Sequence, residues 1–421
     1  MAITPRAISY WSRAIETPEP RRVRGRMSFA FAGACAYVGT LVLPGAGNGA
    51  LVLIACAAIL AFVLDRRAPR SDHELLLAVV SFALAFALST LTGIDPARSL
   101  RLSVPLAPGM LLFLLVSGYF ETGHVRGFYL ALSATSLAMG AQLLWSAWHG
   151  SPGAGPVEWI EDTRTAVFVV PNDVAFFAAV LPLSLALIVD SPKSTRAWLA
   201  AVSSVTALAV VVVYQSRSAL LTSLVAVTLW ACRLQRRKGA ALLGVAMFVT
   251  VATDALLGFP LVTRLAETWS TRVPIWLAAL NMFRDAPLLG NGPRSFGLLF
   301  EEYFQTLTLP GWLPADPRFA PWAHSLYLET LAEQGIIGFG ALVAVLSVGF
   351  AMTIGLRRAG PSETRVLAIG AETALVALCV AGVVELSFVR LWVVVLFFSV
   401  LGAIGALAAT RREDGETCRG Q

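Results

Sequence analysis

One histidine and two arginines of this sequence stand at the ends of long apolar segments, where their side chains could perform group transfer. Arg217 separates two apolar segments in YQSRSALL, Arg272 lies in a proline-rich stretch, and His324 opens HSLYLETLAEQGIIG after that stretch. An imidazole accepts and releases a proton near neutral pH. A guanidinium binds phosphate oxygens through a planar, bidentate fork. The three residue types therefore predict abstraction of a proton beside an anionic leaving group.

Each of these residues also has an ordinary structural interpretation when it is taken alone. Arg217 could extend its side chain to the lipid headgroups and only anchor a helix end. Arg272 could face water on an interfacial amphipathic helix, and a single interfacial histidine such as His324 is more often structural than functional. The functional interpretation gains weight because all three residues flank the same long connection between apolar segments.

Three further side chains near Arg272 and the histidine are candidates for substrate binding. Trp276 follows Arg272 at i+4, so the two share one face if the segment is helical. The turn PLLGNGP at 287–293 ends that helix, and its glycines would let the backbone approach a bulky substrate closely. Arg294, directly after the turn, and Tyr327, in the HSLYLE stretch, complete the set of candidates.

The composition makes a lipid bilayer the main solvent of the elements that carry these residues. Of the 421 residues, 57% are hydrophobic and 14% are charged, whereas a soluble domain carries roughly 25% charged residues. A helix of about 20 apolar residues crosses a bilayer. The sequence therefore predicts an all-α polytopic membrane protein with about twelve transmembrane helices. The apolar segments fall at 27–45, 49–64, 75–93, 102–120, 128–146, 168–190, 198–214, 218–232, 241–259, 326–356, 366–385 and 391–409.

The distribution of Lys and Arg among the loops predicts the orientation of the chain. With the N-terminus inside, the cytoplasmic segments hold 22 of the 32 Lys and Arg residues and the opposite segments hold 10. Cytoplasmic loops of membrane proteins carry such an excess of positive charge. We therefore expect both termini in the cytoplasm, with an uncleaved N-terminal tail over 1–26 and a C-terminal tail over 410–421.

One connection is much longer than the others and divides the predicted helices into two groups. Nine helices fill 27–259, the long connection spans 260–325, and three more helices fill 326–409. Its many aromatic residues argue against disorder. We expect this connection to form a cap of short helices on the non-cytoplasmic surface of the membrane.

The sequence does not favour metal, disulfide or nucleic-acid chemistry. The predicted outward face has no carboxylate cluster with metal-ligand spacing, since Glu301 and Glu302 are adjacent and point apart on a helix. The cysteines lack paired spacing, and the positive charges form no basic stripe. We therefore expect no metal, no cofactor and no nucleic-acid partner.

The order of these features resembles the O-antigen ligase family, which also includes O-antigen polymerases and some protein O-oligosaccharyltransferases. The resemblance runs over most of the chain, particularly from Pro171 onward. It is carried by Pro171-Asn172-Asp173, by Ser216-Arg217, by Arg272 with Trp276 and the PLLGNGP turn, and by HSLYLETLAEQGIIG beginning at His324.

The resemblance implies a GT-C-type glycosyltransferase of the bacterial inner membrane, with one large periplasmic loop. Such an enzyme transfers a polysaccharide from undecaprenyl pyrophosphate to a hydroxyl of lipid A–core on the periplasmic face, with inversion and without a metal. The resemblance implies that His324 is the catalytic histidine and that Arg217 and Arg272 bind the pyrophosphate. It gives no role to Arg294, which could be a further phosphate contact or a surface charge.

Two other functions remain open from the sequence. An O-antigen polymerase would use a lipid-linked glycan as acceptor, and the HSLYLE stretch with its single dominant outward loop favours the ligase. A secondary transporter would place ionisable groups near the membrane midplane, where Asp173 and Glu372 are the main candidates. Most outward arginines lie at segment ends or in the long connection, which favours chemistry at the membrane surface.

Overall fold

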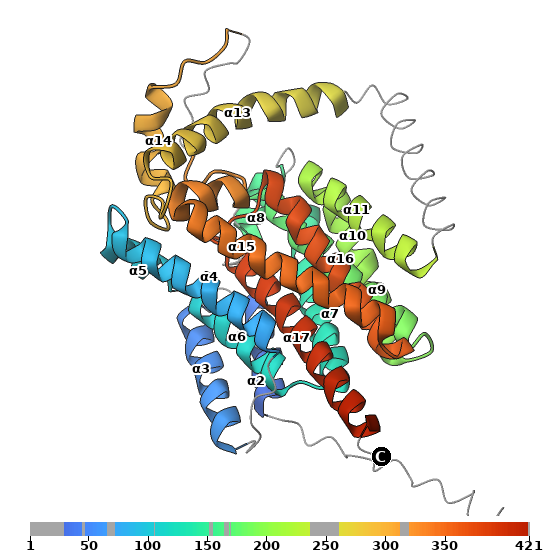
Figure 1. Ribbon diagram of the computed structural model, residues 1–421. Helices are drawn as coiled ribbons and strands as arrows, with labels where there is room; N and C mark the ends of the chain where they lie inside the picture. Colours follow the sequence, from blue (N-terminus) through green and yellow to red (C-terminus); the bar gives the residue numbers. More distant parts are fainter. Residues whose placement is uncertain are drawn as a thin grey trace, which may run out of the picture.

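The structure is a computed structural model, and it is all-helical over the residues that it describes (Figure 1). The described residues are 29–43, 47–64, 72–104, 106–150, 155–163, 168, 170–235, 261–311 and 320–419. The predicted tail 1–26 and the ninth predicted transmembrane segment, 241–259, lie outside these ranges.

Eight of the described helical segments are long and apolar enough to cross a membrane. They are α4 (His73–Thr92), α7 (Thr122–His149), η2 with α9 (Pro171–Val174 and Ala175–Asp190), α10 (Thr195–Val213), α11 (Arg217–Leu234), α15 (Leu326–Ala359), α16 (Ser362–Val384) and α17 (Leu391–Arg419). The bent pair α5 (Pro96–Ser103) and α6 (Leu106–Tyr119) would make a ninth crossing. These helices agree with the predicted all-α, multi-pass membrane protein.

The predicted number of about twelve crossings is not reached within the described ranges. The segments predicted at 27–45 and 49–64 form α2 (Phe29–Gly39) with η1 (Thr40–Val42), and α3 (Gly47–Leu64), whose apolar parts are shorter than a full crossing. The segment predicted at 102–120 contains a bend of 46° between α5 and α6. The number twelve therefore stays a prediction.

Three helices form the buried centre of the bundle. The shares of the apolar spans that are buried reach 78% for the η2–α9 segment, 72% for α16 and 89% for α17. Helices in a membrane associate mainly through close packing, because lipid supplies no hydrophobic force between them, and small residues let their backbones approach. At Gly402 of α17, for example, an added Cβ would meet the Val116 side chain of α6 at 2.8 Å.

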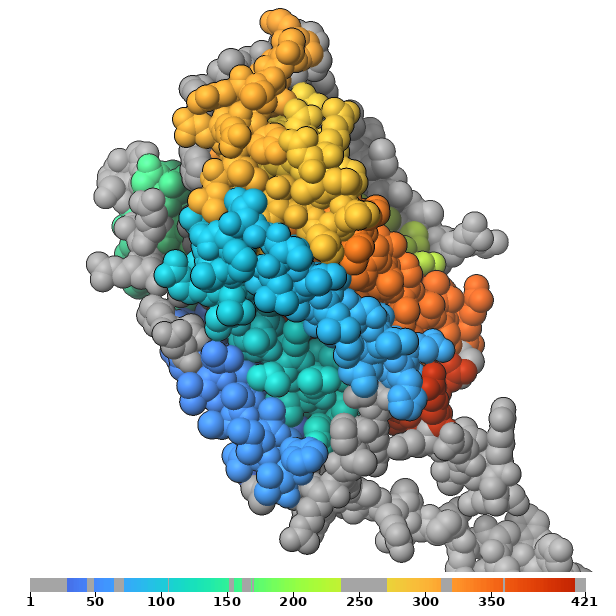
Figure 2. All heavy atoms as spheres, turned by 60° about the vertical axis from the view of Figure 1, so that its left-hand side comes forward, coloured from blue at the N-terminus to red at the C-terminus, as the bar shows by residue number. Residues whose placement is uncertain are grey.

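The long connection builds a cap over one end of the bundle. It contains α13 (Leu261–Asp285) and α14 (Phe296–Gln305), which lie across that end beside α5 (Figures 1 and 2). The cap has its own apolar cluster, made of Ala278, Ala279, Met282, Phe296, Phe300, Ala320 and Ala323, with Ala332 of α15. We expected short helices here, and at 25 residues α13 is longer than that expectation.

Ion pairs at the opposite end of the bundle join segments that were predicted to share the cytoplasmic side. Arg126 pairs with Asp190 and Glu363, and Arg412 pairs with Asp72. Glu363 lies in the first turn of α16, whose 23 residues are about 35 Å long. The capped end and the arginine-rich end are therefore separated by about the thickness of a membrane.

The two carboxylates that were candidates for a transport site are both in ion pairs. Glu372 pairs with Arg233 at 2.8 Å and with Arg357 at 3.2 Å, so it belongs to the arginine-rich end of the bundle. Asp173 is paired with Arg390 at the capped end. These pairs give both carboxylates a structural role.

Candidate functional site

His324 stands immediately before the first turn of α15, in a strained backbone conformation. Its φ angle is +50°, and Ser325 is the N-cap residue of the helix. A residue other than glycine in this left-handed region costs of order 1–3 kcal/mol and persists only where surrounding contacts hold it. The contacts around His324 therefore determine where the imidazole points.

Glu385, which directly follows α16, connects His324 to Arg272. Its Oε1 lies 3.2 Å from His324 Nδ1, and its Oε2 accepts a hydrogen bond from Arg272 Nη2 at 2.7 Å. The side chains of His324, Arg272 and Glu385 are 18%, 14% and 6% exposed, so this group is largely shielded from solvent. Two of the three residues predicted to do chemistry thus meet at a carboxylate that the sequence argument did not name.

The imidazole of His324 has two possible arrangements at Nδ1. Trp322 Nε1 lies 3.1 Å from the same nitrogen that faces Glu385. If Nδ1 carries the proton, it donates to Glu385 and leaves Nε2 able to accept a proton. If Nδ1 is unprotonated, it accepts from Trp322 instead. The carboxylate favours the first arrangement, because a hydrogen bond to a charged group is stronger than one between neutral groups.

Asn172 extends this group to the start of α11, where Arg217 stands. Asn172 Nδ2 donates to Glu385 Oε2 at 2.9 Å, and Asn172 Oδ1 accepts from Ser216 Oγ at 3.2 Å. Ser216 caps α11 through the N–H of Ala219. Arg217, the first residue of α11, is half-buried. The segments of all three predicted residues are therefore joined through Asn172 and Glu385.

A second buried ion pair supports the tryptophan beside His324. Arg390 Nε donates to Asp173 Oδ1 at 2.9 Å, its Nη2 contacts Asp173 Oδ2, and Trp392 Nε1 donates to Asp173 Oδ1 at 2.9 Å. The guanidinium of Arg390 lies 5.0 Å from the centre of the Trp322 ring, within cation–π distance. This pair therefore fixes one wall of the site.

The PLLGNGP turn binds the chain's own backbone. Gly290 and Gly292 have φ angles of +67° and +96°, as a glycine-dependent turn requires. Gly292 N donates to Glu333 O at 2.8 Å, and Ile336 N donates to Pro287 O at 2.8 Å. The turn thereby fills the break in α15 at Gly335, where φ is +63° and ψ is −165°. We expected these glycines to approach a substrate, whereas the structure assigns their close approach to α15.

Arg294 faces the buried carboxyl groups of α15 and the loop that follows α16. Its Nη2 donates to Phe388 O at 3.0 Å, and its charge acts on Glu333 and Glu329 of α15. Burial lowers the pKa of the Arg294 guanidinium, and the two carboxylates oppose that effect. Arg294 is therefore neither an ordinary surface charge nor an evident phosphate contact.

The two remaining candidates occupy different places. Trp276 lies one turn after Arg272 on α13 and is half-buried in the cap. Tyr327 donates from Oη to Cys379 O at 2.9 Å, which directs its hydroxyl to α16. Trp276 therefore lies on the same helix as Arg272, whereas the hydroxyl of Tyr327 is used in helix packing.

Residues 202–343 match a protein-family model described as O-antigen ligase. Over these residues the chain is similar to O-antigen ligases, and the matched segment is called the O-antigen ligase domain after that family. The match confirms the resemblance to the O-antigen ligase and polymerase superfamily, whose members are glycosyltransferase-like enzymes. The O-antigen ligase domain contains Arg217, Arg272 and His324, whereas Asn172 and Glu385 lie outside it. No curated protein matches the chain.

The sequence contains a weak signal for the carboxylate that the prediction missed. Glu385 ends the apolar segment 366–385, and a carboxylate at such an end faces the headgroup region. The O-antigen ligase domain does not extend to this position. Over the described residues, no group of three or more His, Cys, Asp and Glu is arranged to hold a metal ion. Metal independence itself stays a prediction.

Proposed function

We propose that this chain is a GT-C-type O-antigen ligase of the bacterial inner membrane. It transfers a polysaccharide from undecaprenyl pyrophosphate to a hydroxyl of lipid A–core on the periplasmic face, with inversion and without a metal. The O-antigen ligase domain supports the class of enzyme. The contact between His324 and Glu385 is the observation that carries the proposed chemistry.

In the proposed reaction His324 acts as general base in a single displacement. The acceptor oxygen forms a bond to the anomeric carbon while the bond from that carbon to the pyrophosphate oxygen breaks. The hydroxyl proton goes to Nε2 of His324, and undecaprenyl pyrophosphate leaves with the bonding electron pair. Glu385 holds Nδ1–H and stabilises the imidazolium that forms. General-base catalysis of this kind contributes about 10²–10⁴-fold.

The two arginines take the charge that develops on the leaving group. Arg272 Nη2 donates to Glu385 Oε2, and the guanidinium of an arginine presents its N–H donors in a planar fork that matches phosphate oxygens. Arg217 stands at the N-terminus of α11, and a helix N-terminus attracts anions through its backbone N–H groups and its dipole. Both features suit a lipid pyrophosphate, with Trp276, on the same helix as Arg272, as an additional candidate for a substrate contact.

Substitution of the base and the two arginines in the purified chain tests this function. We expect His324→Ala to lose transfer by 10²-fold or more while it still binds the lipid-linked donor. Arg217→Ala and Arg272→Ala should weaken donor use more than the corresponding lysine variants, since lysine keeps the charge and loses the fork. Near-wild-type transfer by His324→Ala would remove this residue from the catalytic role.

Two further experiments test metal independence and distinguish a ligase from a polymerase. Transfer should persist in excess chelator, and a requirement for an added divalent cation would contradict metal independence. In a deletion strain, loss of all polymer from lipid A–core supports the ligase. A core that carries a single repeat unit would instead indicate a polymerase.

Labelling of single cysteines in intact cells tests the proposed orientation. In a variant whose native cysteines are replaced, a cysteine at Glu301 of α14 should react with an impermeant reagent supplied from the periplasm. A cysteine at Lys193, between α9 and α10, should react only after the inner membrane is opened. The reverse pattern would place the cap in the cytoplasm.

A further inference from the structure

The first turns of α15 carry a buried carboxylate that hydrogen-bonds to two short segments of the chain. One segment bears His324 and the other bears Glu385. The carboxylate is that of Glu329, which is 5% exposed. Its Oε2 accepts a hydrogen bond from Ala323 N at 3.3 Å, and its Oε1 accepts one from Ser387 Oγ. Ala323 directly precedes His324, and Ser387 follows Glu385 by two residues. One carboxylate thus joins the two short segments from which the imidazole and its partner project.

Further hydrogen bonds hold the backbone of the loop that contains Ser387. Its Oγ accepts a hydrogen bond from Val389 N at 3.0 Å, and Phe388 O accepts from Arg294 at 3.0 Å. The loop from Ser387 to Val389 is therefore held on one side by Glu329 and on the other by a guanidinium. The backbone on each side of Phe388 has a defined partner.

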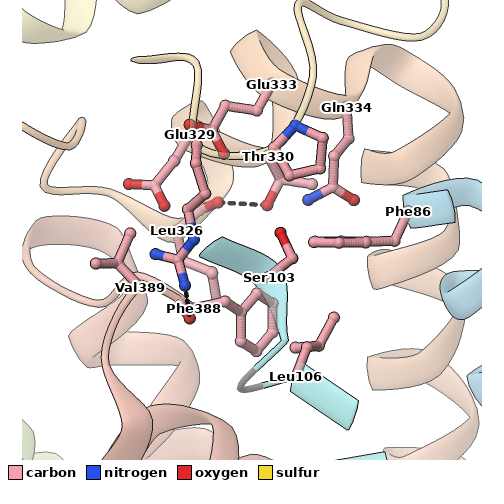
Figure 3. A pocket seen from close by; sticks show the side chains of 12 residues that line it. Phe86, Ser103, Leu106, Leu326, Glu329, Thr330, Glu333, Gln334, Phe388 and Val389 are labelled. Atoms are coloured by element: carbon pink, nitrogen blue, oxygen red, sulfur yellow. Dashed lines mark hydrogen bonds between the residues drawn. The ribbon is translucent and has the colours of Figure 1, made fainter. Parts of the chain in front are cut away.

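The surroundings of Glu329 strengthen these hydrogen bonds. Glu329 and Glu333 lie on one side of a small cavity of about 20 Å³, with Phe86 and Leu106 on the other side (Figure 3). The cavity has room for about one water molecule, so little solvent reaches the buried carboxyl group of Glu329. The positive charge of Arg294 also acts on Glu329. A hydrogen bond to a carboxylate in such a place resists displacement by solvent.

Glu333 fixes the third segment of this arrangement. Its Oε1 accepts a hydrogen bond from Phe296 N at 3.0 Å, directly after the PLLGNGP turn and Arg294. The guanidinium of Arg294 is thereby held between the carboxylates and the Ser387–Val389 loop. Glu333 positions this guanidinium, whereas Glu329 makes the two contacts that lead to His324 and Glu385.

We propose that Glu329 is a positioning residue of the transfer reaction, which sets the distance between His324 and Glu385 through Ala323 N–H and the Ser387 hydroxyl. This inference rests on the proposed function. Glu329 touches neither the substrate nor the reacting atoms. His324 has a strained φ of +50°, so it depends on neighbouring contacts of this kind.

Loss of these contacts should affect the chemical step and spare donor binding. A displacement of about 1 Å of a catalytic group can reduce the rate by about 10²-fold. The hydrogen bonds of Glu329 go to Ala323 and Ser387, whereas Arg272, which is proposed to bind the donor, bonds to Glu385. We therefore expect kcat to fall while the affinity for the lipid-linked donor stays the same.

Steady-state kinetics of the full-length chain in lipid nanodiscs tests the inference. The variants are Glu329→Gln, Glu329→Ala, Ser387→Ala and the double variant Glu329→Ala/Ser387→Ala. Glu329→Ala and Ser387→Ala should lower kcat by about 10- to 100-fold, with donor dissociation constants within twofold of wild type. Glu329→Gln keeps one carbonyl acceptor and should be intermediate. The double variant should match Glu329→Ala, since both substitutions break the same connection. Glu301→Gln, an exposed carboxyl on α14, is the matched control and should behave as wild type.

Three outcomes would overturn the inference: kcat within twofold of wild type in Glu329→Ala, losses that multiply in the double variant, or a loss of donor affinity that accounts for the lower rate. If Glu329→Ala fails to fold, Glu329→Gln and Ser387→Ala give the same decision. The proposed function is tested separately. It is upheld if the wild-type protein transfers the glycan and the His324→Ala variant does not. A failure at Glu329 is thus distinguishable from a failure of the function.

Discussion

Glu385 Oε1 lies 3.2 Å from His324 Nδ1, although 61 residues separate the two in sequence. The carboxylate comes from the end of α16 and the imidazole from the turn before α15, so the contact exists only because these helices pack side by side. A histidine whose Nδ1–H is held by a carboxylate presents Nε2 as a base of defined direction. The contact with Glu385 therefore makes His324 a candidate general base.

Glu385→Gln should lower transfer by roughly 10- to 100-fold, because a hydrogen bond to a charged group contributes about 1.5–3 kcal/mol. The measurement is kcat of the purified variant with donor affinity determined in parallel. Glu363→Gln, at the other end of α16, is the matched control and should keep wild-type kcat. Equal rates for Glu385→Gln and wild type would show that His324 needs no carboxylate partner.

A double-variant cycle separates the two roles that Arg272 can have. Arg272→Ala leaves Glu385 as a buried carboxylate without this guanidinium, which should cost about 3–5 kcal/mol of stability. Arg272→Ala with Glu385→Gln should recover much of that stability in thermal unfolding. If Arg272 also binds pyrophosphate, the double variant stays weaker in donor use than Glu385→Gln alone. Equal donor use by those two variants would limit Arg272 to its pairing with Glu385.

The sequence allowed much of the fold to be predicted, and it singled out Arg272 and His324, which the structure brings together at Glu385. Apolar segments of membrane length identified the helices, and the GNG sequence identified the turn. The chemistry assigned to Arg217, Arg272 and His324 from their residue types stays a prediction. These inferences depend on local composition and on short spacings, which a single chain displays directly. The O-antigen ligase domain then confirmed the family resemblance.

The partners of these residues could not be predicted, because pairing depends on which helices are neighbours. Glu385 and Asn172 come from segments that are 213 residues apart, and no periodicity indicates that η2 lies beside the end of α16. The glycines of the turn were misinterpreted for the same reason. Their positive φ angles were predictable, whereas the backbone that they approach belongs to a helix about 40 residues further on, as in the contact of Asn291 with Ala332.

Asp173→Asn should destabilise the capped end of the bundle. The amide would leave Arg390 as a buried cation without its carboxylate, at a cost of about 3–5 kcal/mol, and would weaken the support of Trp322 beside His324. We expect a lower unfolding temperature in detergent together with slower transfer. Asp190→Asn breaks the buried pair with Arg126 at the opposite end. This matched control should also lower the unfolding temperature and should leave kcat of the folded protein unchanged, whereas equal kcat losses in both variants would make the effect of Asp173 a general one.

Gly335→Ala should disrupt the break in α15 on which the PLLGNGP turn rests. A Cβ at Gly335 would collide with the carbonyl of Leu288 and lie 2.7 Å from Gly290 N, and the backbone angles there are accessible almost only to glycine. The variant must expel the turn or straighten the helix, and either change moves the segment that begins at His324. We expect a loss of about 1–3 kcal/mol from backbone strain alone, measured by thermal unfolding, and a loss of transfer with it. Gly340→Ala lies in the same helix, where an added Cβ meets nothing within 4 Å, so it should retain the stability and transfer of wild type. Wild-type behaviour of Gly335→Ala would mean that the turn and the helix break are not coupled.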